Sequence, residues 1–333
     1  MAPRPERILE RHARRHVGVI AGVRAGDQVQ ILGRGRADAG RRDRPTSATL
    51  FELGSITKVV TALVLADMAL EGLVALDDPV ARHLPPGTGP PVRGRPMTLA
   101  DLASHASGLP RLPKGLLRQA LCDRRNPYAR FTRTQLERAV REARVRRAPG
   151  RLRYSNFGAG LLGHVLSLRA GRGYEDLARE RVCAPLGMAE TRIAIPARDA
   201  PRLAQGHDRR GRPVPGWDLP ALAGAGALRS TPSDMLRFLA GQLHPPDGRL
   251  GSAIRLTHEP RVRRGKLHVG LGWLSLPLGR GRARALWHNG GTGGFRAFAG
   301  FVPGAGAAVV VLSNSARSVD ALGFRLLEAA LDG

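Results

Sequence analysis

Hydrophobic and polar positions divide the chain into strand-like ends and a helical middle. Near the start, residues 17–23 and 28–32 are rich in Val and Ile and flank a Gly26-Asp27 pair, which predicts a β-hairpin. Near the end, four short apolar runs separated by Gly or Pro predict an antiparallel meander, and a last apolar-periodic segment predicts a closing helix. The four runs are residues 271–276, 285–287, 295–301 and 307–312, and the helix is 319–331.

The middle of the chain has apolar positions at helical spacing. Thr134 and Ser233 are typical of helix starts, with Pro232 ahead of the second. We therefore predict a single α+β unit over 1–333, in which an antiparallel sheet is built from both chain ends and flanked by helices. The sheet part is expected in 1–75 and 225–333, and 76–224 is expected to be a mainly helical inserted part. The predicted helices in between are 55–76, 99–104, 134–147, 157–170 and 233–242.

Composition is that of an ordinary folded enzyme-sized chain. Of 333 residues, 42% are hydrophobic and 24% are charged, which excludes a disordered tail, a collagen-like rod and a disulfide miniprotein. The two cysteines, Cys122 and Cys183, lack the spacing of a metal site or a disulfide framework. We expect both to be reduced, and we predict neither a metal nor an organic cofactor.

The formal net charge of +26 is unusual. All but three of the 53 basic residues are arginine, and they are scattered over the whole chain. Aromatic residues, at 4%, are too few to interleave with them as base-stacking platforms. We therefore interpret the charge as solvated surface and predict no specific nucleic-acid partner. An arginine-rich nucleic-acid-binding protein is the alternative.

The N-terminal segment predicts a cytoplasmic protein. Residues 1–16 are basic and polar and contain no apolar core of a secretory signal. The longest apolar stretch, 59–76, contains Asp67 and Glu71, so it is unsuited to a bilayer. No membrane partner is predicted, and the oligomeric state is left open.

The strongest candidate for chemistry is Ser55-Ile-Thr-Lys58 at the start of a predicted amphipathic helix. The spacing places both side chains on one face. The positive end of the helix favours a developing oxyanion near Ser55 and eases loss of the Lys58 proton. A neutral Lys58 could then take the Ser55 proton, which arginine could not do. An N-cap serine followed by a solvated lysine is the alternative.

Two further motifs contain residue types that are scarce in this chain. Tyr154-Ser-Asn156 supplies a phenol, which could ionise partly beside a cationic lysine, and an amide that could hold a lysine or a substrate carbonyl. It also has the form of a helix-capping turn. Residues 287–295 read Trp-His-Asn-Gly-Gly-Thr-Gly-Gly-Phe, where glycines permit close approach of a ligand and His288 could bind an anion. A wide loop with a satisfied histidine is the alternative.

The order Ser-x-x-Lys, Tyr-Ser-Asn, His-Asn-Gly resembles the serine β-lactamase and penicillin-binding-protein superfamily. Within it, the chain is most similar to the class C β-lactamase-like group, which includes esterases and D-amino-acid peptidases. Further stretches at 102–110, 183–188 and 226–234 fit the same resemblance, which spans about residues 10–332. The family fold, an antiparallel sheet with flanking helices and a helical domain, agrees with the pattern read above.

The resemblance implies a role for each matching position. Ser55 would be the acylated nucleophile, Lys58 its base, and Tyr154 the proton donor to the leaving group and later the activator of water. Asn156 would orient Lys58 and a substrate amide, and the backbone N–H groups of Ser55 and Gly291 would form the oxyanion hole. Along the strand that faces the substrate, the resemblance implies three residues: His288, Asn289 and Gly290.

The chain departs from the family at the third of these motifs, which we call the third box. Members that bind penicillins usually carry Lys-Thr-Gly where this chain has His288-Asn289-Gly290, and a histidine is charged only part of the time at neutral pH. We therefore expect a serine hydrolase acting on an ester or amide, with a small acyl substrate (ester, amide or lactam) as its partner. A true β-lactamase or D-Ala-D-Ala carboxypeptidase, and a biosynthetic acyltransferase or transamidase, are the alternatives.

Overall fold

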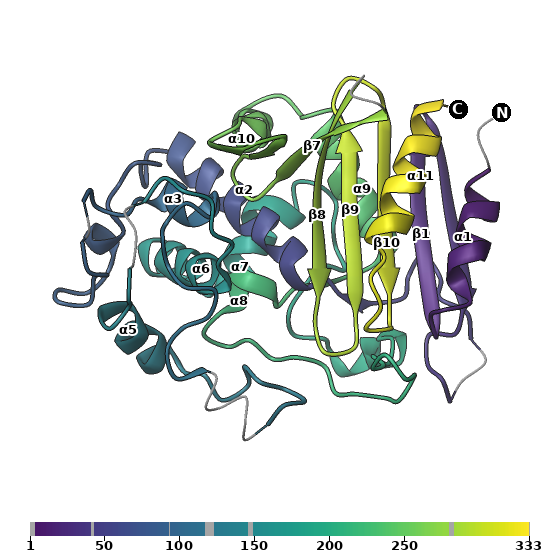
Figure 1. Cartoon of the computed structure of the whole chain (residues 1–333), viewed down its shortest axis with the longest axis horizontal. Coiled ribbons are helices and arrows are strands. Elements are labelled where there is room, and N and C mark those ends of the chain that lie inside the picture. The colour runs from purple at the N-terminus through teal and green to yellow at the C-terminus, as the bar shows by residue number, and fades with distance from the viewer. Residues whose placement is uncertain are drawn as a thin grey trace.

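An eight-stranded antiparallel sheet runs through the computed structural model, which describes residues 4–40, 43–92, 94–116, 123–145, 149–279 and 283–332. Within these residues the strand order is β2-β1-β10-β9-β8-β7-β6-β5 (Figure 1). Cys122 lies outside the described residues, and Cys183 is a buried free thiol. The strands are β1 Gly18–Ala25, β2 Gln28–Gly35, β5 Val262–Arg264, β6 Leu267–Val269, β7 Leu274–Leu278, β8 Ala283–Gly291, β9 Arg296–Val302 and β10 Ala307–Ser313.

The two ends of the chain meet in this sheet, as predicted. The hairpin β1–β2 turns at Gly26, whose φ of +56° suits a tight two-residue turn. On its other side β1 pairs with β10, with Val19 opposite Ser313. The α+β prediction of a sheet assembled from both chain ends is therefore confirmed.

The two faces of the sheet carry separate cores because successive strand residues point to opposite faces. Val19 and Ala21 of β1 pack with α1 (Pro5–Ala13) and α11 (Asp320–Asp332). Ile20 faces the other way, into the larger core that includes α9 (Pro232–Leu243). Figure 1 shows α1 and α11 on one side of the sheet and most other helices on the opposite side.

The helix that follows Ser55 is buried rather than amphipathic. It begins as a 3-10 turn, η1 (Gly54–Ile56), and continues as α2 (Thr57–Leu70), in which every residue from 57 to 68 is buried. It is enclosed by other helices, and the prediction of a solvent-facing side is wrong. The remaining helices are η2 Val80–His83, α3 Leu99–Ala103, α5 Arg133–Arg141, α6 Asn156–Ala170, α7 Tyr174–Ala178, the π-helical η3 Arg179–Cys183, η4 Ala197–Arg202, α8 Ala223–Gly226 and α10 Arg249–His258.

Several predicted boundaries moved by two or more residues. The helix starts are capped by Thr132 and Thr231, each two residues before the predicted serine or threonine. Strand β8 extends to Gly291, because the glycine-rich run that resembled a loop pairs with β9. Two short strands, β5 and β6, were not predicted.

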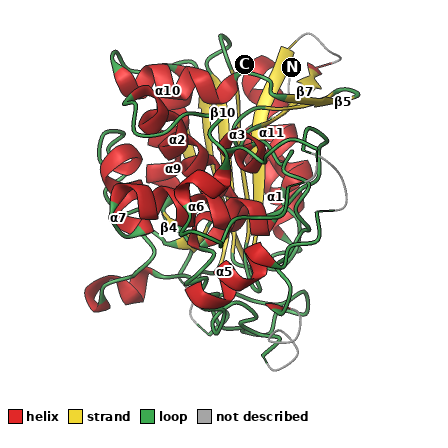
Figure 2. Ribbon diagram, turned by 90° about the vertical axis from the view of Figure 1, so that its left-hand side faces the viewer, coloured by secondary structure: helices red, strands yellow, loops and turns green. Residues whose placement is uncertain are grey.

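The layer of helices between the two sheet-forming ends contains α3, α5, α6 and α7, and Figure 2 shows it in front of the sheet. A short two-stranded ladder, β3 (Phe51–Glu52) with β4 (Arg229–Ser230), joins the segment before α2 to the segment before α9. The beginning of α2 thus lies between the helical layer and β8.

No described helix has the length and apolar composition needed to cross a bilayer.

Candidate active site

The Ser55 turn is built by close approach of two backbones. Gly54 has φ +52°, and a Cβ there would lie 2.5 Å from the backbone nitrogen of Gly291. A Cβ on Gly290 would lie 1.9 Å from the carbonyl oxygen of Leu53. Only glycine fits at these two positions, so the motif residues Ser55, Gly290 and Gly291 are brought together as predicted.

Strand β8 has a free edge where it meets this turn. Its neighbour β7 pairs with it only up to Trp287, so residues 288–291 pair with β9 alone. Unpaired strand edges offer backbone N–H and C=O groups to a ligand. This geometry leaves the backbone of 288–291 facing the Ser55 turn.

Lys58 is held against the Ser55 hydroxyl inside the protein. Its Nζ lies 2.8 Å from Ser55 Oγ and 2.6 Å from the carbonyl oxygen of Ala225, and the residue is 3% exposed. Burial lowers the pKa of Lys58 well below its ordinary value, and the charge of Arg111 acts in the same direction. In the neutral form the amine donates to Ala225 and accepts from Ser55, which is the arrangement of a nucleophile and its base.

The cause of the lowered pKa differs from the predicted one. Easier proton loss was expected from the positive helix end, whereas removal of Lys58 from water is the largest cause. Ala225, which fixes the direction of the amine, was not predicted. Asn156 was expected to orient Lys58, but the amine hydrogen-bonds to Ser55 and Ala225 instead.

Tyr154 lies over the same lysine and remains a neutral phenol. The ring centroid is 5.1 Å from Lys58 Nζ. Burial raises the pKa of Tyr154 to about 12, against the opposing effects of the Ser55 hydroxyl and of Arg111. The expected partial ionisation is therefore wrong for the resting site, and Tyr154 is poised to give a proton rather than to take one.

His288 faces this cluster from β8 and is uncharged. Its side chain is buried, and Nδ1 donates to the backbone carbonyl of Asn289 at 2.6 Å. Burial lowers the pKa of His288 to about 3, with a further contribution from Lys58. The expectation of a part-time cation at neutral pH is therefore wrong. His288 cannot anchor a carboxylate by charge.

The two asparagines of the motifs lie in different places: Asn156 lies at the site and Asn289 does not. Asn289 follows His288 on the strand, so its side chain points to the opposite face, where Nδ2 donates to Asp320 at 2.9 Å. Its predicted place at the substrate is wrong. Asn156 lines the cavity at Ser55, and its Oδ1 is buried without a hydrogen-bond partner among the described residues. Asn156 thus presents a free acceptor to the site.

The cavity beside Ser55 is small and partly open to solvent. Its volume is about 20 Å³, roughly enough for one water. Trp217 forms one wall, and its indole Nε1 donates to the carbonyl of Arg125 at 2.9 Å. Asn126 and Asp218 exchange two hydrogen bonds of 3.0 Å next to it. Three lining residues were not predicted, because they lie outside the three sequence motifs: Tyr128, Trp217 and Leu219.

His105 was also missed as a site residue. Its ring centroid lies 4.4 Å from that of Tyr154, and its φ of +59° is unusual for a residue with a side chain. Burial lowers the pKa of His105 well below its ordinary value, and Lys58 and His288 act in the same direction. The available signal was its position in the 102–110 stretch that fits the family resemblance.

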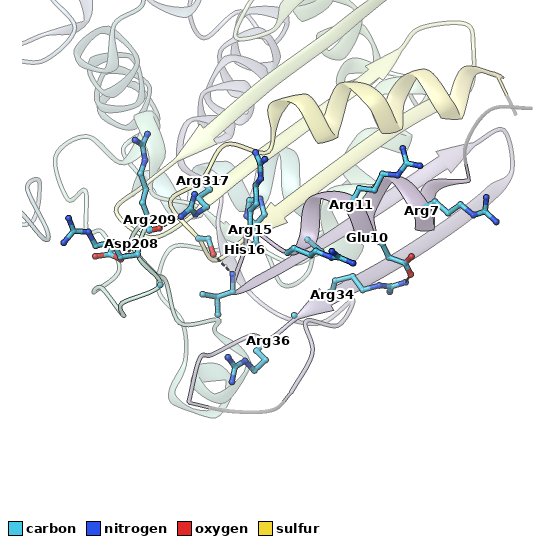
Figure 3. Close-up of a pocket in the computed structure, with 17 residues that line it drawn as sticks. Arg7, Glu10, Arg11, Arg15, His16, Arg34, Arg36, Asp208, Arg209 and Arg317 are labelled. Atoms are coloured by element: carbon cyan, nitrogen blue, oxygen red, sulfur yellow. Dashed lines mark hydrogen bonds and ion pairs between the residues drawn. The ribbon is translucent and has the colours of Figure 1, made fainter.

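A second, much larger depression lies away from this site. It has a volume of about 1300 Å³ and is bounded by α1, the end of β2 and the turn at 208–211 (Figure 3). We call it the arginine groove, after the nine arginines that line it. They are Arg7, Arg11, Arg14, Arg15, Arg34, Arg36, Arg209, Arg210 and Arg317.

Neither the acidic side chains of the arginine groove nor any cluster of potential metal ligands forms a second reactive centre among the described residues. The two acids of the arginine groove are already paired, Glu10 with Arg34 and Asp208 with Arg212. In the described part of the chain, no three His, Cys, Asp or Glu side chains gather as ligands of a metal ion. The nucleophile-and-base geometry is therefore at Ser55 and Lys58.

Known proteins resemble this chain over nearly its whole length. The family model described as Beta-lactamase matches residues 6–331. A D-alanyl-D-alanine-carboxypeptidase/endopeptidase of Escherichia coli K12 is 30% identical over 313 residues, covering 88% of this chain and 79% of that protein. A β-lactamase of Pseudomonas fluorescens is 27% identical over 329 residues, covering 89% of this chain and 88% of that protein.

Solved structures agree. A class C β-lactamase from Rhodobacter sphaeroides superposes with a TM-score of 0.83 at 26% identity and covers 98% of both chains. A β-lactamase/D-alanine carboxypeptidase from Yersinia pestis superposes with a TM-score of 0.80 at 27% identity, covering 98% of this chain and 96% of that one.

Proposed function

Since the chain belongs to the β-lactamase family and is a serine hydrolase, we propose that it forms an acyl-enzyme on Ser55. The bond it hydrolyses is the amide or lactam bond of a small substrate that carries a carboxylate. The observation that carries this proposal is the 2.8 Å contact between Ser55 Oγ and the buried Lys58 amine. A desolvated lysine at this distance is a base that can activate a serine.

Acylation follows from the geometry. Ser55 Oγ attacks the carbonyl carbon while its proton passes to Lys58 Nζ, and the backbone N–H groups of Ser55 and Gly291 stabilise the oxyanion. The bond to the leaving nitrogen then breaks as Tyr154 donates its phenolic proton to that nitrogen. Lys58 returns a proton to Tyr154, so the site ends neutral with an ester on Ser55.

Deacylation reverses these roles. A water attacks the ester carbonyl and gives its proton through Tyr154 to Lys58. When the bond to Ser55 Oγ breaks, Lys58 returns a proton to the serine oxygen and the acid product is released. The free Oδ1 of Asn156 is an acceptor for an N–H of the bound substrate, which an amide offers and a simple ester lacks.

The names of the relatives decide which substrate to test first. Two of those described above are named as D-alanyl or D-alanine carboxypeptidases, so a peptide ending in D-Ala-D-Ala is the first choice. Penicillins present a related amide and carboxylate. The acyltransferase and nucleic-acid alternatives are not favoured by the names of these relatives. A cytoplasmic location stays a prediction.

Intact-protein mass spectrometry and product analysis test the proposal together. The wild type and Ser55→Ala are each incubated with diacetyl-Lys-D-Ala-D-Ala, with benzylpenicillin and with p-nitrophenyl butyrate. We expect release of D-alanine or a penicilloyl adduct with the wild type only, and a loss of at least about 10³-fold in Ser55→Ala. Reaction with the ester alone, or equal reaction of both proteins, would contradict the proposal.

A further inference from the structure

The proposed substrate carries a carboxylate, but the expected anchor for it is neutral. His288 occupies the position of the family's third-box lysine, and its pKa of about 3 leaves it uncharged at neutral pH. Lys58 is buried between Ser55 and Ala225 and serves as the base. A carboxylate removed from water needs a charged partner, so the site requires a cation from elsewhere.

Arg111 is an exposed arginine whose guanidinium lies against Tyr154 of this site. Its Cζ lies 5.3 Å from the ring centroid of Tyr154, on a ring that also contacts Lys58. Its backbone is fixed, because its carbonyl oxygen accepts from the N–H groups of Asn156 at 2.9 Å and of Phe157 at 3.2 Å. The side chain therefore starts from a rigid point at the beginning of α6 and ends beside the proton donor.

The charge of Arg111 acts on several groups of the site. Burial is the main cause of the altered pKa values of Lys58, Tyr128 and Tyr154, and in each case Arg111 contributes a lowering effect. These three residues surround Ser55 from different sides. Arg111 is thus electrostatically coupled to the catalytic groups.

Arg111 also keeps its binding capacity free. Arg181 and Arg249 both pair with Asp67, whereas Arg111 has no ion pair with an acidic side chain within the described residues. A guanidinium offers two parallel N–H donors that match a carboxylate.

We propose that Arg111 is the carboxylate-binding residue of the active site and holds the carboxylate on the leaving-group side of the scissile bond. The side follows from Tyr154, which contacts Arg111 and gives its proton to the leaving group under the proposed function, on which this inference rests. Arg111 is exposed and does not line the small cavity at Ser55, so the group it binds lies towards solvent. Its ligand is therefore the C-terminal carboxylate of a peptide, or the ring carboxylate of a penicillin.

The test compares substrates that differ only in this carboxylate. Diacetyl-Lys-D-Ala-D-Ala is paired with its C-terminal amide, and benzylpenicillin with its methyl ester. We expect Arg111→Gln to lower kcat/KM about 10- to 100-fold for the carboxylates, mainly through KM, and less than threefold for the neutral partners. Arg111→Lys should recover part of the loss. Arg151→Gln removes another exposed arginine, three residues before Tyr154 in the sequence, and should change neither.

A pH profile gives a second readout that a merely structural role would not move. Arg111 lowers the pKa of Lys58, so its removal raises that pKa and shifts the acidic limb of kcat/KM to higher pH. Equal losses on both members of a pair, or an unshifted limb, would overturn the role of Arg111 and leave the proposed function intact. Failure of the wild type on all four substrates would instead overturn the proposed function.

Discussion

The cavity at Ser55 and the arginine groove both lie beside basic side chains, yet those side chains differ in their access to water. The first has a volume of about 20 Å³, and the amine that contacts its Ser55 belongs to Lys58, which is 3% exposed. The second has a volume of about 1300 Å³, and all but one of its nine arginines are exposed. The comparison is thus between one desolvated amine, that of Lys58, and a set of hydrated guanidinium groups.

The difference teaches that desolvation, rather than the number of charges, creates reactivity here. In the open groove, water and salt screen the arginines from one another, and none of them can lose its proton. At Ser55, burial penalises the charged form of Lys58 and turns it into a base. The high net charge of the chain therefore says little about its chemistry.

Removing the desolvated amine should have the largest effect. Lys58→Met keeps the length of the side chain but leaves Ser55 without a base, and we expect acylation by benzylpenicillin to slow by at least about 10³-fold. Lys58→Arg should be as inactive and also less stable, because a guanidinium stays charged when buried. Stopped-flow acylation and thermal melting measure the two effects.

The melting temperature of Lys58→Met serves as the folding control. The folded pKa of Lys58 lies below the unfolded one, so at neutral pH the native state holds an amine that the unfolded state would protonate. We therefore expect Lys58→Met to be at least as stable as the wild type at pH 7, with the difference shrinking towards pH 10. A folded Lys58→Met that retains a tenth of the activity would contradict the role of Lys58 as base.

The buried histidine gives an intermediate effect, on stability in acid. The pKa of His288 falls from 6.5 to about 3 on folding, so the unfolded state binds a proton that the native state does not. The contribution of neutral His288 to the free energy of unfolding should be fully present above pH 6.5. It should decline by on the order of a few kcal/mol as the pH falls towards 3. His288→Gln should flatten this decline in urea titrations, and the exposed-site control His244→Gln should not. Equal slopes in all three proteins would argue that His288 is solvated.

The smallest effects are expected in the arginine groove. The triple variant Arg11→Gln, Arg15→Gln and Arg36→Gln should keep kcat/KM within about twofold and stability within about 0.5 kcal/mol. Its elution from phosphocellulose should shift no more than that of a matched triple variant at exposed arginines of β5 and α11 that do not line the groove. That control changes Arg263, Arg264 and Arg325 to Gln.

Either of two results would erase the contrast between the regions. A tenfold loss of activity in the groove variant would connect the groove to catalysis. A much larger drop in its elution salt than in the control would make the groove a dedicated anion site rather than solvated surface.

Much of the fold followed from local patterns. The β1–β2 hairpin and the β9 and β10 strands were predicted within a few residues, because alternating Val, Ile and Gly residues set both strand and turn. The pairing of β1 with β10 was expected only in outline, since their register joins residues almost 300 positions apart. Strands β5 and β6 were missed because they are short and their burial is partial.

The candidate site was predictable where a motif stays together in space. Ser55 and Lys58 are three residues apart on one turn, so their contact follows from helical geometry. Gly54 and Gly290 are glycines because a Cβ at either position would clash with the facing backbone. Asn289 was assigned wrongly, because a strand alternates its side chains while the motif had been read as a run of neighbours.

What the sequence by itself determined is the set of residue types and their spacing: a serine and lysine one turn apart, a tyrosine, and glycines that permit close contact. Only the tertiary structure decided the electrostatics of the site, because desolvation depends on which distant segments cover a group. Ala225 directs the Lys58 amine, Trp217 lines the cavity and burial makes His288 neutral. These effects arise from packing between segments remote in sequence, which spacing along the chain does not encode.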